Sequence, residues 1–164
     1  MFKKIGQKLK DQRGLTLIEL LAVVVILGII AAIAIPSIGG LINNSKKDAH
    51  IANAQQMVSA ARLAVSAGEA EFSSNSATID LATLISSGYV EPIDNPSDGT
   101  YDTAGSKVIV ARDASTGNYT YKATLTTNED GTPGYFVEKD PDTLTRDGVS
   151  LAGSNTTSST ADGS

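Results

Sequence analysis

The sequence predicts an α+β protein in which one long N-terminal helix packs on a small antiparallel β-sheet head. Two observations predict this fold. A nearly unbroken apolar run over residues 15–35 continues into an amphipathic stretch that ends near Gly68. After it come short runs rich in alternating or β-branched residues, separated by turn sequences rich in Gly, Asn and Asp. The length of 164 residues allows one ordinary domain, or one small domain with an appendage.

The composition excludes several kinds of site. The chain has no Cys, so a disulfide, a thiolate zinc site and a thiol nucleophile are impossible. Its one His, His50, cannot make a two-His metal motif, and we expect it on the solvated surface of the amphipathic stretch. There is no Gly-rich phosphate loop after a strand and no recognisable cleft with paired carboxylates. We therefore expect no enzymatic activity, no cofactor and no metal site.

Residues 1–14 form a basic leader. Five Lys and Arg side chains stand against one Asp, which gives a net charge of 5 − 1 = +4. The rest of the chain has 13 − 5 = 8 basic and 18 − 1 = 17 acidic side chains, a net charge of −9. A basic flank before an apolar run predicts a cytoplasmic N-terminus. The acidic remainder argues against strong DNA binding.

Residues 15–36 are predicted to span a membrane. Over residues 15–35, only Thr16, Glu19 and Gly28 are not apolar. A helix of this length covers the ~30 Å hydrocarbon core of a bilayer. Glu19 is the anomaly, because a carboxylate in an apolar span is costly and usually functional. By position alone, it either reaches the headgroups at the cytoplasmic end or meets a cation inside a protein assembly.

A cleaved signal peptide is the alternative for this region. Residues 32–34 read Ala-Ile-Ala, the pattern of a signal peptidase site. Against it, the apolar run is longer than a usual signal-peptide core, it contains Glu19, and the helical pattern continues past Ala34. These features favour a helix that stays in the mature protein.

Residues 14–20, GLTLIEL, closely resemble the cleavage and methylation motif of type IV prepilins and related pseudopilins. The resemblance implies that a membrane prepilin peptidase cuts after Gly14 and that the new amino group of Leu15 is then N-methylated. The family most often has Phe where this chain has Leu15. Glu19 falls at the family's glutamate, which the resemblance makes an assembly residue. Cleavage would create an ammonium at Leu15 that can pair with Glu19 of a neighbouring subunit.

The resemblance implies the pilin fold and a structural function. The chain would polymerise through its N-terminal helix into a type IV pilus at the cell surface. Its partners would be other pilin subunits, the prepilin peptidase, an inner-membrane assembly platform and a cytoplasmic assembly ATPase, with the membrane holding it before assembly. One alternative is a pseudopilin of a DNA-uptake or type II secretion system. Another is a single-pass membrane protein that never polymerises. The Leu-x-x-Leu-x-x-x-Gly-Tyr-Val spacing over residues 81–90 is similar to a connector seen in many Gram-positive pilins and competence pseudopilins.

Residues 37–68 are predicted to continue the helix and pack on the head. Pro36, where the family keeps an assembly proline, removes one helical hydrogen bond and is expected to bend the helix. Beyond it, apolar residues recur at spacings of three and four and form one stripe. The stripe consists of Ile51, Ala54, Val58, Ala61 and Val65.

Residues 69–152 are predicted to form the head with about three strands. The strand candidates are residues 107–112, 119–125 and 134–139, and one sheet face should lie on the helix stripe. Before them, Asp80 is expected to cap a short helix that Gly88 ends. Residues 153–164 are rich in Ser and Thr and are predicted to be a disordered tail, on which attached sugar is an open alternative.

Two acidic loops leave calcium binding open. One contains Asp94, Asp98 and Asp102, and the other lies within residues 139–148, KDPDTLTRDG. Neither fits the spacing of an EF-hand loop. Turns and a solvated acidic surface are the other interpretation of both loops.

Overall fold

The computed structural model describes residues 3–127 and 134–151, and the side chains from Thr16 onward. The predicted tail therefore lies outside the described residues. The chain divides into two compact units, residues 1–42 and residues 43–164. The first contains the apolar part of the N-terminal helix, and the second contains the rest of this helix together with the head.

The N-terminal helix, α1, runs from Lys3 to Ala67. It begins well before Leu15, where the sequence predicted its start, because the leader is composed mainly of good helix formers such as Lys, Gln, Leu and Arg. The predicted stop is confirmed. Gly68 follows at φ 81, a left-handed conformation that glycine adopts without a steric penalty.

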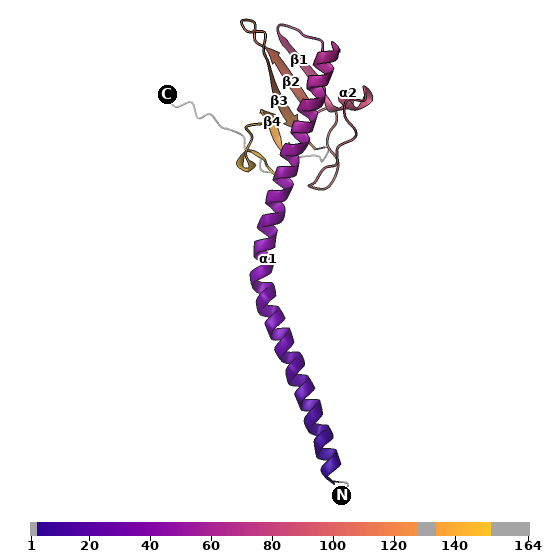
Figure 1. Cartoon of the computed structure of the whole chain (residues 1–164), viewed down its shortest axis with the longest axis vertical. Coiled ribbons are helices and arrows are strands. Elements are labelled where there is room, and N and C mark those ends of the chain that lie inside the picture. Colours follow the sequence, from indigo (N-terminus) through magenta and orange to yellow (C-terminus); the bar gives the residue numbers. More distant parts are fainter. Residues whose placement is uncertain (1–2, 128–133, 152–164) are drawn as a thin grey trace, which may run out of the picture. The chain divides into compact units, whose positions relative to one another are not determined.

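The head contains a four-stranded antiparallel sheet in the order β1-β2-β3-β4 (Figure 1). Its strands are β1 (Ser76–Asp80), β2 (Lys107–Arg112), β3 (Tyr119–Leu125) and β4 (Phe136–Lys139). Each strand pairs with the next along the chain, so the sheet is a simple meander. The register between β3 and β4 shifts between Ala123 and Leu125, which marks a bulge. The predicted α+β architecture, a long helix with a small antiparallel sheet, is confirmed.

The prediction of three strands was wrong by one. β1 runs over Ser76–Asp80, where the sequence analysis placed only the approach to a short helix. Ala77 and Ile79 are buried and Thr78 is exposed, so the segment does alternate. The alternation covers five residues, three of them polar, and this is too short to stand out from a loop.

The predicted apolar stripe of α1 faces the sheet. Ala54, Val58 and Ala61 are buried, and Ile51 and Val65 pack against the core while partly buried. The buried face is wider than the predicted stripe. It also includes Met57, Ala60 and Ala64.

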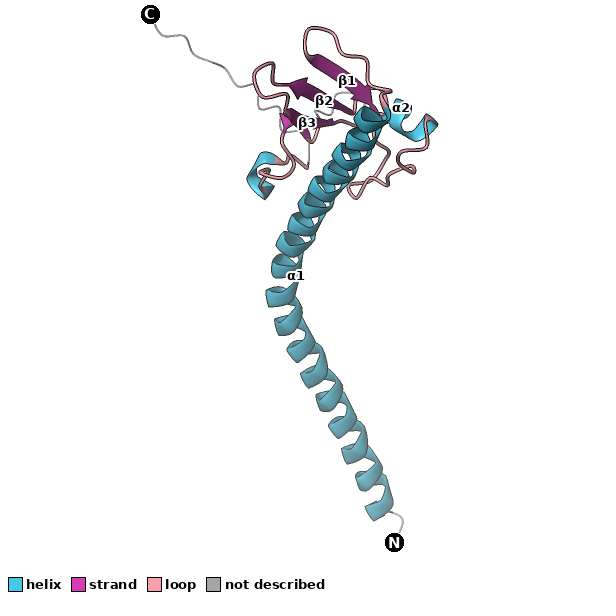
Figure 2. Ribbon diagram, turned by 45° about the horizontal axis from the view of Figure 1, so that its top comes forward, coloured by secondary structure: helices cyan, strands magenta, loops and turns pink. Residues whose placement is uncertain are grey.

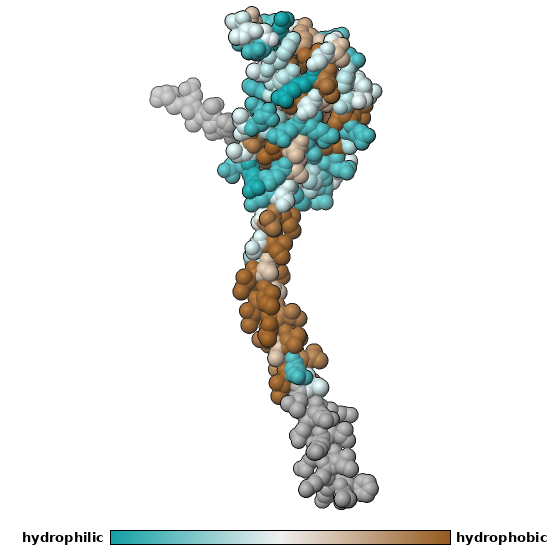
Figure 3. All heavy atoms as spheres, viewed as in Figure 1, coloured by the Kyte–Doolittle hydropathy of each residue, from teal (hydrophilic) through white to brown (hydrophobic). Residues whose placement is uncertain are grey.

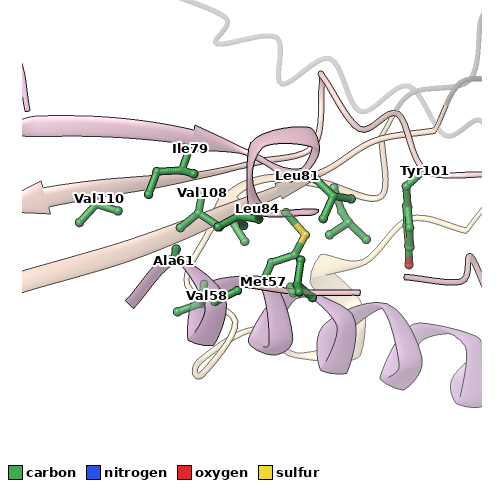
Figure 4. Packing of buried hydrophobic residues seen from close by; sticks show 14 of the residues in the cluster. Met57, Val58, Ala61, Ile79, Leu81, Leu84, Tyr101, Val108 and Val110 are labelled. Atoms are coloured by element: carbon green, nitrogen blue, oxygen red, sulfur yellow. The ribbon is translucent and has the colours of Figure 1, made fainter. Parts of the chain in front are cut away.

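The core joins α1, α2 and the sheet in one cluster of buried residues. In Figure 4, Met57 and Val58 of α1 point toward the strand and α2 side chains, among them Val108 and Leu84. Met57, Leu84 and Val108 are all 0% exposed. The head is therefore organised around α1, and loss of a large core side chain should loosen the helix and the sheet together.

A short helix, α2 (Leu81–Ser86), follows β1 directly (Figure 2). As predicted, Asp80 is its N-cap, and its Oδ1 accepts a hydrogen bond from the backbone N–H of Thr83 at 2.6 Å. Gly88, at φ 75, lies just beyond its end. Asp80 thus ends a strand and begins a helix with no linker between them.

Replacing Asp80 by Ala should lower the free energy of unfolding of the head by about 1 kcal/mol, because one N–H of α2 loses its acceptor. Asp80→Asn is the matched variant, since asparagine caps about as well. Chemical denaturation followed by the tyrosine circular dichroism signal measures both. Equal losses in the two variants would show that Asp80 does not act as a cap.

The C-terminal part of the head is held to α1 by ion pairs. Arg146, which begins the 3₁₀ turn Arg146–Gly148, donates through Nε and Nη2 to the two carboxylate oxygens of Asp48, each at 2.6 Å. This guanidinium lowers the pKa of Asp48. Arg62 of α1 also pairs with Asp142 at 3.3 Å. These contacts join residues 80 and 98 positions apart in the sequence.

Candidate functional site in the N-terminal helix

The first unit presents an apolar surface that the described residues do not cover. Every large apolar side chain from Leu17 to Ile42 is exposed, with accessible fractions between 50% and 72%. The visible face of this segment in Figure 3 is apolar almost throughout. Soluble monomers rarely expose an apolar surface of this size. The segment therefore requires an apolar environment that a single chain in water does not provide.

The same segment meets the physical requirements of a membrane anchor. From Thr16 onward, α1 contains a window that is long and apolar enough to cross a membrane, and none of that window is buried in the protein. An α-helix satisfies all its internal backbone hydrogen bonds within itself, so it is compatible with the hydrocarbon core. One such helix near the N-terminus fits a single-pass anchor.

Glu19 lies on this apolar segment and is exposed in the single chain. Its neighbours at three and four positions along the helix, among them Thr16 and Val23, carry no positive charge. Among the described side chains, none forms an ion pair with Glu19. If the segment is buried in lipid or in protein, this carboxylate is costly unless it reaches the headgroups or meets a cation.

The other predicted site residues lie on α1. Gly14 and Leu15 are within the helix, but their surroundings lie outside the described side chains. Pro36 is inside the helix, which continues to Ala67. Cleavage at Gly14, methylation at Leu15 and an assembly role for Pro36 remain predictions.

His50 corrects an expectation from the sequence. It was expected on a solvated surface, but it is 0% exposed. Its Nδ1 lies 2.7 Å from the Tyr101 hydroxyl and its Nε2 lies 2.7 Å from Ser97 Oγ. Burial lowers its pKa to about 4, and the positive charge of Lys46 adds to this effect. The signal was present in the sequence, since His50 lies four positions before Ala54 and extends the apolar stripe by one turn.

No metal centre forms within the part of the chain that the structure describes, where no three His, Asp or Glu side chains gather closely enough to hold an ion. Several acidic side chains of the two loops accept hydrogen bonds from backbone N–H groups of their own turns, or form an ion pair with an arginine. Asp102 Oδ1 accepts from the Ala104 N–H at 3.0 Å, and Asp140 Oδ1 accepts from the Asp142 N–H at 3.0 Å. Asp142 also pairs with Arg62.

The N-terminal part of the chain matches a known family model. Residues 9–35 match the family model for the prokaryotic N-terminal methylation motif. Searches of curated proteins and of solved structures give no significant match. The matched region contains Gly14, Leu15 and Glu19 and ends next to Pro36, so it covers the predicted processing residues and most of the exposed apolar segment. The chain therefore carries the N-terminal signature of type IV prepilins and pseudopilins.

Proposed function

We propose that this chain is a type IV pilin, a structural subunit that polymerises through its N-terminal helix into a filament at the cell surface. The observation that carries the proposal is the exposed apolar segment of α1, which holds one carboxylate and coincides with the N-terminal methylation motif. A filament core of packed helices would bury this surface. The acidic head would then form the exterior of the filament.

The positive charge of the leader suggests the order of membrane insertion and cleavage. The basic leader keeps the N-terminus in the cytoplasm while α1 crosses the membrane and the head lies on the far side. The prepilin peptidase cuts after Gly14 and removes the leader. The mature chain then begins at Leu15 with an ammonium group and has a net side-chain charge of −9.

The pairing of Glu19 explains how subunits find their register. In a bundle of apolar helices, the Leu15 ammonium of an incoming subunit meets the Glu19 carboxylate of a neighbour. A misplaced subunit leaves both charges buried without a partner, which is strongly unfavourable. The apolar side chains supply contact area but little directionality, so the charge pair selects the correct position.

Assembly requires an energy source outside this chain. Lipid tails are about as apolar as leucine, so moving α1 from the bilayer into a filament gains packing but little hydrophobic free energy. The chain has no nucleotide-binding motif. We therefore infer that a cytoplasmic assembly ATPase acts through an inner-membrane platform to extract the subunits.

A pseudopilin of a DNA-uptake or secretion system is the second candidate, because the methylation motif is common to both groups. The Ser- and Thr-rich tail and the size of the head favour a surface pilus. The acidic charge of the mature chain disfavours tight DNA binding along the filament. Electron microscopy of material sheared from cells separates long filaments from a short pseudopilus.

The processing step is tested by replacing Gly14 with valine. Mass spectrometry should find that the wild-type protein begins at a methylated Leu15, whereas the Gly14→Val protein keeps its leader. Gly6→Val is the matched control, because it changes another leader glycine and should leave cleavage intact. An unprocessed wild-type chain that still begins at Met1 would instead support a single-pass membrane protein that never polymerises.

A further inference from the structure

The buried His50 fastens an irregular segment of the head to α1. Residues 94–99 belong to no helix or strand. Ser97 Oγ of this segment lies 2.7 Å from His50 Nε2. One turn along α1, the Asn53 Nδ2 group donates to the backbone oxygen of Asp94 at 3.0 Å. Two polar side chains of one helix face therefore hold the segment.

Aromatic rings enclose the histidine. The ring of Tyr135 stacks on His50 with centroids 3.7 Å apart, and Tyr101 meets it edge-on at 5.7 Å. The Tyr135 hydroxyl in turn exchanges hydrogen bonds with the Asn95 side chain, at 2.8 and 3.0 Å. His50 and Tyr135 thus hold the same segment from two sides, and the imidazole is their point of contact.

The enclosure of His50 favours a neutral ring, because the side chain is 0% exposed and a buried cation without an anionic partner is costly. In either neutral tautomer, one ring nitrogen donates and the other accepts. Protonation makes both nitrogens donors, so the hydroxyl that donated to the ring must turn to accept instead, and the added positive charge stays buried. The titratable groups that face the ring are Tyr101, Tyr135 and Lys46. Burial raises the pKa of Tyr101, so its hydroxyl stays protonated, and the Lys46 charge opposes a second cation.

No carboxylate among the described residues hydrogen-bonds the ring to compensate for its protonation. Asp98 pairs with Lys46 at 3.8 Å, but its side chain is 94% exposed, and an exposed pair of this kind holds a segment weakly. Asp98 also has φ 72, followed by Gly99 at φ 69. The turn that ends the segment is therefore a conformation that an aspartate adopts only at some steric cost.

We propose that His50 is an acid-sensitive latch: the neutral ring helps to hold residues 94–99 against α1, and protonation of the ring weakens this attachment, so that the segment opens more often. The rest of the head stays folded, because its core is apolar and the nearby chain is anchored separately. Asp102 N–H donates to the Thr126 oxygen at 3.0 Å, and Leu81 N–H donates to the Ser106 oxygen at 2.8 Å. Release would uncover the buried His50 ring without unfolding the sheet.

The direction of the pH dependence follows from linkage. A released His50 has an ordinary pKa near 6.5, whereas in the closed head burial lowers its pKa to about 4. Between these values the released state binds more protons, so the closed state is fully favoured above about pH 6.5 and loses its advantage as the pH falls. The opening equilibrium should rise by up to about tenfold for each pH unit in this range.

The test uses the full chain in detergent micelles. Because His50 is the one histidine of the sequence, its ring gives a single imidazole NMR signal whose titration is read directly. Hydrogen exchange by mass spectrometry, between pH 7.5 and pH 4.5, then compares peptides covering residues 91–101 with peptides from β2 and β3. The intrinsic exchange rate also changes with pH, so each measurement is compared with His50→Gln, whose side chain donates and accepts but does not titrate.

Three results are expected together. The imidazole titrates well below pH 6.5, residues 91–101 lose protection in acid while β2 and β3 keep theirs, and His50→Gln removes the acid-dependent part of this loss. A ring that titrates near pH 6.5 in the folded protein would overturn the latch, and this readout requires no variant. Simultaneous loss of protection in β2 and β3 would also overturn it, because that result describes acid unfolding of the whole head.

Discussion

Glu19→Ala should reduce surface filaments by at least about tenfold while leaving membrane insertion unchanged. The variant removes the acceptor for the Leu15 ammonium of the neighbouring subunit, and an unpaired buried charge costs about 3–5 kcal/mol. Insertion should persist, because alanine makes the span more apolar. Sheared filaments are quantified by immunoblot and electron microscopy, and insertion is measured by fractionation of the membranes.

Two further variants isolate the charge of Glu19. Glu19→Gln keeps the size and polarity of the side chain but not its charge, so it should assemble poorly as well. Glu71→Ala removes an exposed carboxylate from the head and should assemble normally. Filament yields equal to wild type in both Glu19 variants would contradict the pairing of Glu19 with Leu15.

Met57→Ala should lower the free energy of unfolding of the head by about 2–5 kcal/mol. Met57 is 0% exposed and belongs to the core cluster formed by α1, α2 and the sheet. Alanine removes its apolar contacts and leaves a cavity that surrounding strands and helices cannot fully close. Chemical denaturation of the full chain in detergent, followed by near-ultraviolet circular dichroism of the tyrosines, measures the change.

Leu63→Ala is the matched control for this prediction. Leu63 is a large apolar residue of the same helix, but it is 58% exposed. Its replacement should change stability by less than about 0.5 kcal/mol. Similar losses from Met57→Ala and Leu63→Ala would contradict the assignment of the helix face that packs on the sheet.

Much of the architecture could be predicted because its signals are local. The strands Lys107–Arg112 and Tyr119–Leu125 have the bounds that their apolar patterns predicted, and the third candidate is two residues shorter, at Phe136–Lys139. The Asp80 cap and the glycine stop at Gly68 depend on backbone chemistry within a few residues. Such features can be predicted because they depend on residues that are close together in the sequence.

The candidate site was partly predictable for the same reason. An apolar run that includes Glu19 is visible in the sequence, and the structure adds that no described part of the chain covers it. The environment of His50 was not predictable from its neighbours. It depends on Ser97, Tyr101 and Tyr135, which lie at least 47 positions away and reach the ring only in the folded head.

The ion pairs of the C-terminal segment give the head a property that a covalent tie would lack. Arg146 with Asp48 and Arg62 with Asp142 close the head onto α1 with no oxidant and no thiol chemistry. The closure is therefore reversible and should form equally well in reducing and oxidising surroundings. Its sensitivity is to ionic strength, because the side chains of these pairs are about half exposed and mobile ions screen them. Added salt, rather than a reductant, should loosen this end of the head first.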